Sequence, residues 1–195
     1  MNCRLIRPSM AMLVGAAVLM LSSAYADAAH AANANASLLP SVTCTLGWDT
    51  TEFSPPLRLA NEDTTVTAQG SVNGCLPNTY GISRATYTVQ AAGNINCLDG
   101  GQAGGSFAFT WFDAQNNVIG VSTASYGPGS GSFQLRLDGA SIVVVKGTVQ
   151  SGLFAGGNMT FQTDVVNLDV TACLRDTGVG SLAGPVTEVT FSSPL

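Results

Sequence analysis

Histidine and lysine are almost missing from this chain, because each occurs only once, as His30 and Lys146. His30 lies in the Ala-rich segment DAAHAANANA, ahead of the first residues with a regular pattern, so the folded domain is expected to contain no histidine. A Ser-His-Asp triad, a Cys-His nucleophile and a histidine-ligated metal centre all require an imidazole. The sequence therefore argues against all three kinds of site in the folded domain.

Charge of either sign is also scarce, since only 10% of the residues are Asp, Glu, Lys or Arg. The formal net charge is −5, and it becomes −7 without the first 26 residues, which contain two arginines and no acid. An acidic chain without a basic stripe is not expected to bind nucleic acid or to adhere to anionic membranes. Its polar surface must consist mostly of Thr, Ser, Asn, Gln and Gly.

The first 26 residues have the composition of a secretory signal peptide. Arg4 and Arg7 precede the apolar stretch 11–21, and Ala24-Tyr25-Ala26 provides a small-x-small cleavage site. The apolar stretch is shorter than the roughly 20 residues that span a bilayer, so we expect cleavage after Ala26. We predict a signal peptide at 1–26, a flexible Ala- and Asn-rich tail at 27–40 and a single all-β domain at 41–195. The mature protein is then secreted, into the medium, the periplasm or the cell envelope, with no membrane span.

Four cysteines remain once Cys3 is removed with the signal peptide: Cys44, Cys75, Cys97 and Cys173. An even number of cysteines in an exported chain indicates two disulfide bonds. No C-x-x-C pair occurs, so neither a zinc knuckle nor a thioredoxin-like site is expected. Three pairings are open. We favour Cys44–Cys75 with Cys97–Cys173, because the first bond would join two strands that follow one another.

From Val42 onward, apolar and polar residues alternate with the period of a β-strand, and no segment shows the period of an amphipathic helix. Ten strands are predicted, at 42–48, 64–73, 84–91, 105–112, 117–124, 131–137, 141–150, 158–166, 168–173 and 185–192. The side chains expected to face the core are Val42, Cys44, Leu46, Trp48, Val66, Ala68, Val72, Tyr87, Val89, Phe107, Phe109, Trp111, Ile119, Val121, Phe133 and Leu135. Short connections favour an antiparallel β-sandwich or a flattened β-barrel of about 8–10 strands, between which periodicity does not distinguish.

Lys146 lies inside the apolar run SIVVVKGTVQ, where burial would lower the pKa of its amine and suit it to catalysis. Within its strand, however, Lys146 alternates with Val145 and Val149 and so belongs to the polar face. In the next strand, Gln162 and Asp164 lie on that same face. We therefore predict an exposed lysine opposite Gln162, with Asp164 as its nearest acid, and not a catalytic amine.

Carboxylates are the remaining candidates for catalysis. Asp164 with Asp169, or two among Asp99, Asp113 and Asp138, would have to face each other to form a glycosidase-like pair. Nothing in their spacing selects two of them, and each occupies a position typical of turn or surface acids. The sequence therefore predicts no catalytic residue.

Neither a cofactor site nor a metal site is predicted. The glycine-rich segments 98–105, 126–132 and 178–184 do not join a strand to a helix, as a phosphate-binding loop requires. The oxygen-rich stretches 61–63 and 113–117 do not match the spacing of an EF-hand, so we interpret them as turns.

Several short motifs span most of the mature chain: CTLG (44–47), SPPL (54–57), GSVNGC (70–75), KGTVQSGLFAG (146–156) and GPVT (184–187). In these motifs the chain resembles an uncharacterised family of small secreted all-β proteins that is common in actinobacteria. The resemblance implies export, a β-rich fold and paired cysteines. It supplies no activity and no catalytic residues.

The absence of a catalytic constellation favours a disulfide-stabilised, non-catalytic binding or envelope-associated module, whose Thr-, Asn- and Gly-rich surface would contact a glycan or a protein. One alternative is a β-barrel that carries a small apolar ligand in a cavity lined by Phe107, Phe109, Trp111 and Phe133. A carboxylate-dependent hydrolase is a further alternative. A ligand-sized apolar cavity would favour the carrier, and a filled core would favour the module.

Overall fold

The structure of the protein is a computed structural model that describes residues 41–194 except for 77–79, 98–101, 136–140 and 166–169. The predicted signal peptide, the predicted tail and His30 lie outside these residues. The described chain forms the elements β1 (Ser41–Leu57), β2 (Glu62–Leu76), β3 (Arg84–Ile95), β4 (Gly104–Phe112), β5 (Val118–Tyr126), β6 (Gly131–Leu135), β7 (Ser141–Gly152), β8 (Asn158–Val165), α2 (Val170–Cys173) and β9 (Val179–Ser192). No helix among the described residues is long and apolar enough to cross a membrane.

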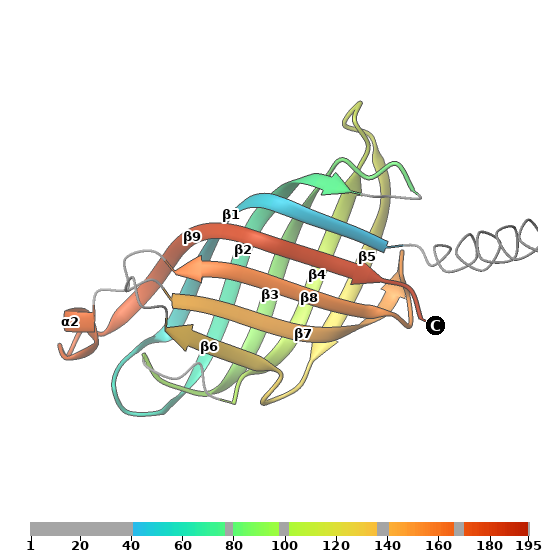
Figure 1. Ribbon diagram of the computed structural model, residues 1–195. Helices are drawn as coiled ribbons and strands as arrows, with labels where there is room; N and C mark the ends of the chain where they lie inside the picture. The colour runs from blue at the N-terminus through green and yellow to red at the C-terminus, as the bar shows by residue number, and fades with distance from the viewer. Residues whose placement is uncertain (1–40, 77–79, 98–101, 136–140, 166–169, 195) are drawn as a thin grey trace, which may run out of the picture. The chain divides into compact units, whose positions relative to one another are not determined.

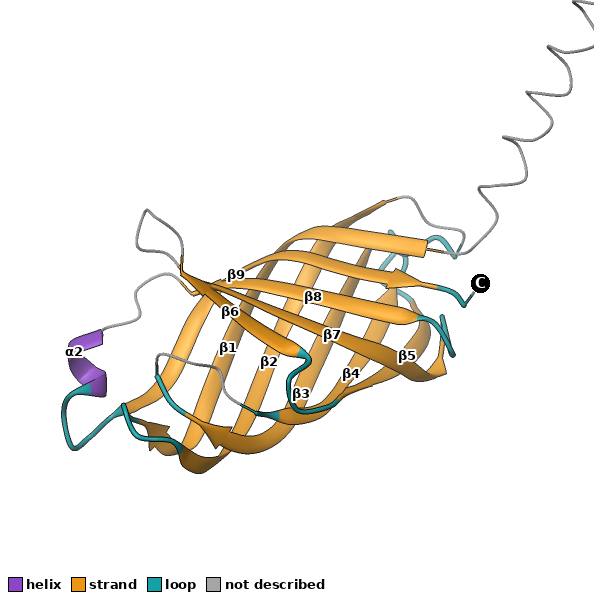
Figure 2. Ribbon diagram, turned by 60° about the horizontal axis from the view of Figure 1, so that its bottom comes forward, coloured by secondary structure: helices purple, strands orange, loops and turns teal. Residues whose placement is uncertain are grey.

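The strands form one antiparallel sheet in the order β5-β4-β3-β2-β1-β9-β8-β7-β6. β5 also pairs with β7, which closes eight strands into a barrel (Figure 1 and Figure 2). β5 and β6 share one edge of β7: β5 pairs with its C-terminal half and β6 with its N-terminal half. The prediction of an all-β fold is confirmed, and the fold is a barrel and not a sandwich. Alternation could not decide this, because both folds bury one face of each strand.

The strand predicted at 168–173 is wrong, because Val170–Cys173 forms the short helix α2. Valine and threonine have high strand propensity, but this propensity depends strongly on context. Here Cys173 is buried and bonded to Cys97, so the segment is held against the end of the barrel and does not join the sheet. Figure 1 places α2 at the end of the barrel opposite the C-terminus.

Both disulfide bonds have the pairing that the sequence analysis favours. Cys44 in β1 is directly opposite Cys75 in β2, with 4.0 Å between their Cα atoms. Cys97 follows β3 and is bonded to Cys173 at the end of α2. Disulfide bonds persist in oxidising compartments, so the two bonds suggest an oxidising, extracellular environment.

The inward-facing residues of β1 differ from the predicted set. Cys44 is buried as predicted, but Leu46 is 66% exposed and Trp48 is 55% exposed. The alternation changes sides between Cys44 and Gly47, so Asp49 and not Trp48 faces the interior. A one-residue change of phase moves every later side chain of the strand to the other face.

The two neighbours of β1 change sides at the same level. The buried residues on either side of this level are Val72 and Cys75 in β2, and Val186 and Val189 in β9. Each pair is three residues apart, whereas regular alternation places inward residues two apart. At this level Gly47 leaves the space in which Val72 and Val186 approach each other across β1. We call this line across β9, β1 and β2 the crease.

The other predicted core positions are mostly confirmed. Val72, Tyr87, Val89, Phe107, Phe109 and Trp111 are buried, and Val66, Ala68 and Ile119 are partly buried. Val121 is 55% exposed instead, because the inward positions of β5 are Ser122 and Ala124. The side chains of Phe133 and Leu135 lie outside the described residues.

Lys146 is exposed on the outer face of β7, as predicted. It lies opposite Thr160, however, and not opposite Gln162, which pairs with Val144. Asp164 pairs with Ile142 and not with Val144, and is therefore two residue pairs further from Lys146 along the hairpin than predicted. The interpretation of Lys146 as a solvated strand residue agrees with its exposure, while its predicted partner in the hairpin is wrong.

Buried side chains form two clusters in the barrel. The aromatic cluster consists of Tyr87, Phe107, Phe109, Trp111, Phe154, Phe161 and Phe191. Within it the Trp111 indole donates a hydrogen bond to Ser122 Oγ at 2.8 Å, so the buried indole N–H has a partner. The end cluster lies near α2 and consists of Leu57, Ile95, Cys97, Cys173 and Val179.

Candidate functional site: a cavity with a buried carboxyl group

A cavity of about 190 Å³ lies between the aromatic cluster and the end cluster and is partly open to solvent. Its apolar wall consists of Phe53, Leu57, Val66, Ala68, Val89, Ile95, Phe107, Val143, Val145, Phe161, Val165 and Leu182. An engineered apolar cavity of roughly 150 Å³ binds benzene. The cavity in this barrel therefore has the size of a ligand with one or two rings.

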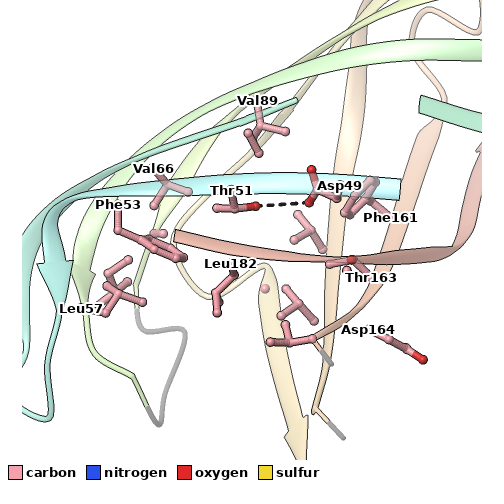
Figure 3. A pocket seen from close by; sticks show the side chains of 18 of the residues that line it. Asp49, Thr51, Phe53, Leu57, Val66, Val89, Phe161, Thr163, Asp164 and Leu182 are labelled. Carbon is pink, nitrogen blue, oxygen red and sulfur yellow. Dashed lines mark hydrogen bonds between the residues drawn. The ribbon is translucent and has the colours of Figure 1, made fainter. Parts of the chain in front are cut away.

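Asp49 brings a carboxyl group into this apolar wall. Its side chain is 5% exposed, and its Oδ2 accepts a hydrogen bond of 3.2 Å from Thr51, the next inward residue of β1. Figure 3 shows this pair among the apolar side chains that surround it. Because the crease changes the phase of β1, the acid of the sequence TLGWDTT lies inside the barrel.

Glycines flank Asp49 in both neighbouring strands. Asp49 pairs with Gly70 in β2 and with Gly184 in β9. A side chain at position 70 would occupy the place of the Tyr87 hydroxyl group, and one at position 184 would collide with the backbone of Asp164. The two glycines thus let Tyr87 from β3 and the backbone of β8 lie close to the carboxyl group.

Burial raises the pKa of Asp49 to about 6, although hydrogen bonds from Thr51, Tyr87 and the Thr50 backbone act in the opposite direction. The Tyr87 hydroxyl group and Asp49 Oδ1 are both buried, and neither makes a hydrogen bond of normal geometry. The pKa of Tyr87 is raised first by burial and then by the negative charge of the nearby Asp49 carboxyl group. At neutral pH the cavity therefore contains a carboxylate with unused hydrogen-bonding capacity.

The structure does not bring the predicted carboxylate pairs together. Asp164 lines the cavity, but its side chain points away from Asp49 (Figure 3). Asp113 lies in the turn between β4 and β5, where hydrogen bonds from the side chain and backbone of Asn117 and from the backbone of Gln115 lower its pKa. The remaining candidates, Asp99, Asp138 and Asp169, lie outside the described residues.

Only part of the predicted cavity lining is correct. Phe107 lines the cavity, whereas Phe109 and Trp111 are buried in the aromatic cluster below it. The side chain of Phe133 is not among those described. Asp49 is not a candidate from the sequence, because continuous alternation from Val42 assigns it to the outer face. The signal for its inward position is Gly47, two residues earlier, where the alternation of β1 changes sides.

A second depression lies on the outer surface of β1 to β4, beside the exposed indole of Trp48. Its other polar side chains are all uncharged: Gln69, Ser71, Thr86, Tyr87, Thr88 and Thr110. Such a surface agrees in composition with the glycan or protein contacts that the sequence suggests. It contains no group with a perturbed pKa other than Tyr87, whose hydroxyl group faces the interior.

No protein-family model, characterised protein or solved structure matches this chain. Within the described part of the chain, no three His, Cys, Asp or Glu side chains are grouped so as to hold a metal ion. The chemistry available in the cavity is therefore that of one buried carboxyl group and its hydroxyl neighbours in an apolar surrounding. A function has to be inferred from this cavity and from the outer surface.

Proposed function

We propose that the protein is a secreted, non-catalytic barrel that binds a small apolar ligand in the cavity between its two clusters. The cavity itself is the observation that carries this proposal. Protein interiors are packed to the density of organic crystals, and voids larger than a water molecule are few. A partly open apolar cavity of about 190 Å³ leaves apolar wall in contact with water, which is unfavourable. An apolar ligand that fills this space would remove that wall from water.

The scaffold around the cavity supports a binding role. Eight strands closed by hydrogen bonds hold the wall, and the Cys97–Cys173 bond fixes the end cluster at one side of the cavity. Pre-formed cavities bind with a smaller loss of conformational entropy than sites that must first become ordered. Export follows from the predicted signal peptide, and the two disulfide bonds agree with an oxidising destination.

Blocking the cavity tests this function. Ala68 in β2 lines the cavity, so Ala68→Phe should fill it, whereas Ala108→Phe places the same ring on the exposed outer face of β4. Calorimetric titration with 2-phenylethanol should show binding to the wild type and to Ala108→Phe. Ala68→Phe should bind at least tenfold more weakly, with an unchanged or higher melting temperature. Equal binding by both variants would show that the ligand lies elsewhere.

The outer depression carries a second candidate function, the binding of a glycan. An exposed indole beside hydroxyl and amide side chains provides a flat apolar face for a sugar ring and hydrogen bonds for its hydroxyl groups. Trp48→Ala should abolish retention on immobilised polysaccharides, while Leu46→Ala, which removes an exposed apolar side chain from the same strand, should not. Equal retention of both variants and the wild type would exclude the indole from glycan binding.

A further inference from the structure

The described residues of the cavity wall carry charge of one sign. The charged side chains among the described residues that line it are Asp49 and Asp164, and there is no lysine or arginine among them. A ligand that carries a carboxylate would thus meet like charge in a partly desolvated space, which weakens its binding. A ligand that carries a positive charge would meet the carboxyl group of Asp49, which has opposite charge when ionised.

Asp49 is the buried acid of the cavity wall. Asp49 lines the cavity together with the rings of Phe107 and Phe161, which belong to the aromatic cluster. Its Oδ1 is buried and makes no hydrogen bond of normal geometry, so the carboxylate keeps an acceptor position that no donor fills. The faces of aromatic rings attract cations within about 6 Å, and the effect is larger when water is excluded. The same cavity wall thus provides aromatic rings as well as a carboxyl group.

We propose that the ligand is a small apolar amine whose protonated nitrogen donates a hydrogen bond to the Asp49 carboxylate while its apolar part fills the cavity. This inference rests on the proposed function and specifies the class of ligand. A charge-assisted hydrogen bond in a desolvated site is stronger than a neutral one. An amine is thus preferred over an alcohol of the same shape, and an alcohol is preferred over a carboxylic acid.

The groups that face Asp49 set the pH dependence of this preference. They are Thr51 on β1 and Tyr87 on β3. Tyr126 on β5 and Asp164 on β8 also line the cavity, but the Asp164 side chain points away from Asp49. β2 and β9 contribute glycine beside the carboxyl group. The pKa of Tyr126 is raised to about 12 by burial, so neither tyrosine ionises near neutral pH. Protonation of Asp49 below about pH 6 is therefore expected to weaken amine binding.

The test uses three ligands with the same ring: 2-phenylethylamine, 2-phenylethanol and phenylacetate. Calorimetric titration of the mature wild type at pH 7.5 should show the amine binding at least tenfold more tightly than the alcohol, and phenylacetate more weakly than either. At pH 5 the affinity for the amine should fall several-fold, while that for the alcohol should change less than twofold. In Asp49→Asn the amine should lose its advantage, and the alcohol should still bind, which also shows that the variant is folded.

Glu52→Gln is the matched control, because it removes one negative charge from the exposed face of the same strand. It should keep the preference for the amine. Equal affinity for amine and alcohol in the wild type, or an unchanged preference in Asp49→Asn, would overturn the inference and leave the proposed function standing. If none of the three compounds binds to the wild type, the inference and the proposed function fail together.

Discussion

At the scale of single residues, the ionised form of Asp49 is destabilised by its burial in the folded protein. Its pKa is about 6 in the folded protein against an ordinary value of 3.8. The folded state therefore binds a proton that the unfolded state has already released between these two values. By linkage, the stability that the neutral carboxyl group provides is fully present below about pH 4 and is lost as the pH rises through 6.

Asp49→Asn should remove this dependence on pH. Two pK units correspond to about 3 kcal/mol, so the unfolding free energy of the variant relative to that of the wild type should rise by about that amount between pH 4 and pH 7.5. Urea denaturation of both proteins across this range measures the difference. If the unfolding free energies of the two proteins differ by the same amount at every pH, the carboxyl group is solvated and not buried.

Lys146 illustrates an ordinary surface charge. It is exposed on the outer face of β7, so Lys146→Gln should change the unfolding free energy by less than about 0.5 kcal/mol. Val149, three residues later, is buried in the core, and Val149→Lys should destabilise by several kcal/mol because it buries an unpaired charge. Thermal melts of the two variants provide the comparison. A larger effect at position 146 would contradict the assignment of the faces of β7.

At the scale of secondary-structure elements, the crease separates what could be read from the sequence from what could not. Alternation correctly assigned the buried faces of β3 and β4, for example Tyr87 and Phe107, since both strands keep one phase. It failed from Leu46 onward, because β1 changes phase only in concert with β2 and β9. That contact between strands is not present in the pattern of any one of them. The alternation within single strands therefore does not predict that Asp49 lies in the cavity wall.

Gly70 in β2 offers a test at this scale. A methyl group at this position would meet the Trp48 carbonyl oxygen and the Tyr87 hydroxyl group, so Gly70→Ala should destabilise the barrel by about 1–3 kcal/mol. Gly180→Ala is the control, because nothing lies within 4 Å of its added carbon. It should be neutral or slightly stabilising. Melting temperatures compare the two, and equal values would mean that Tyr87 does not need the space at Gly70.

At the scale of the whole molecule, the two disulfide bonds close loops of 31 and 76 residues. In the loop-entropy description each bond stabilises the fold by roughly 4 kcal/mol. Intact-mass analysis of the denatured, exported protein should find no free thiol before reduction and four afterwards. Reduction should then lower the unfolding free energy by several kcal/mol. Alkylation of any cysteine in the untreated protein would contradict the pairing.

The pairing of β1 with β9 has a consequence for the order of events during synthesis. Thr43 and Thr190 are hydrogen-bonded through their side chains although they are 147 positions apart in the chain. Contacts of such sequence separation form late, because a long loop has to close before they can stabilise the fold. While the chain emerges from a ribosome or a translocation pore, β1 has no partner on one side until β9 has followed it out. The barrel therefore closes only after β9 has emerged, and a polypeptide stalled before β9 presents an open strand edge and an exposed apolar interior to its surroundings.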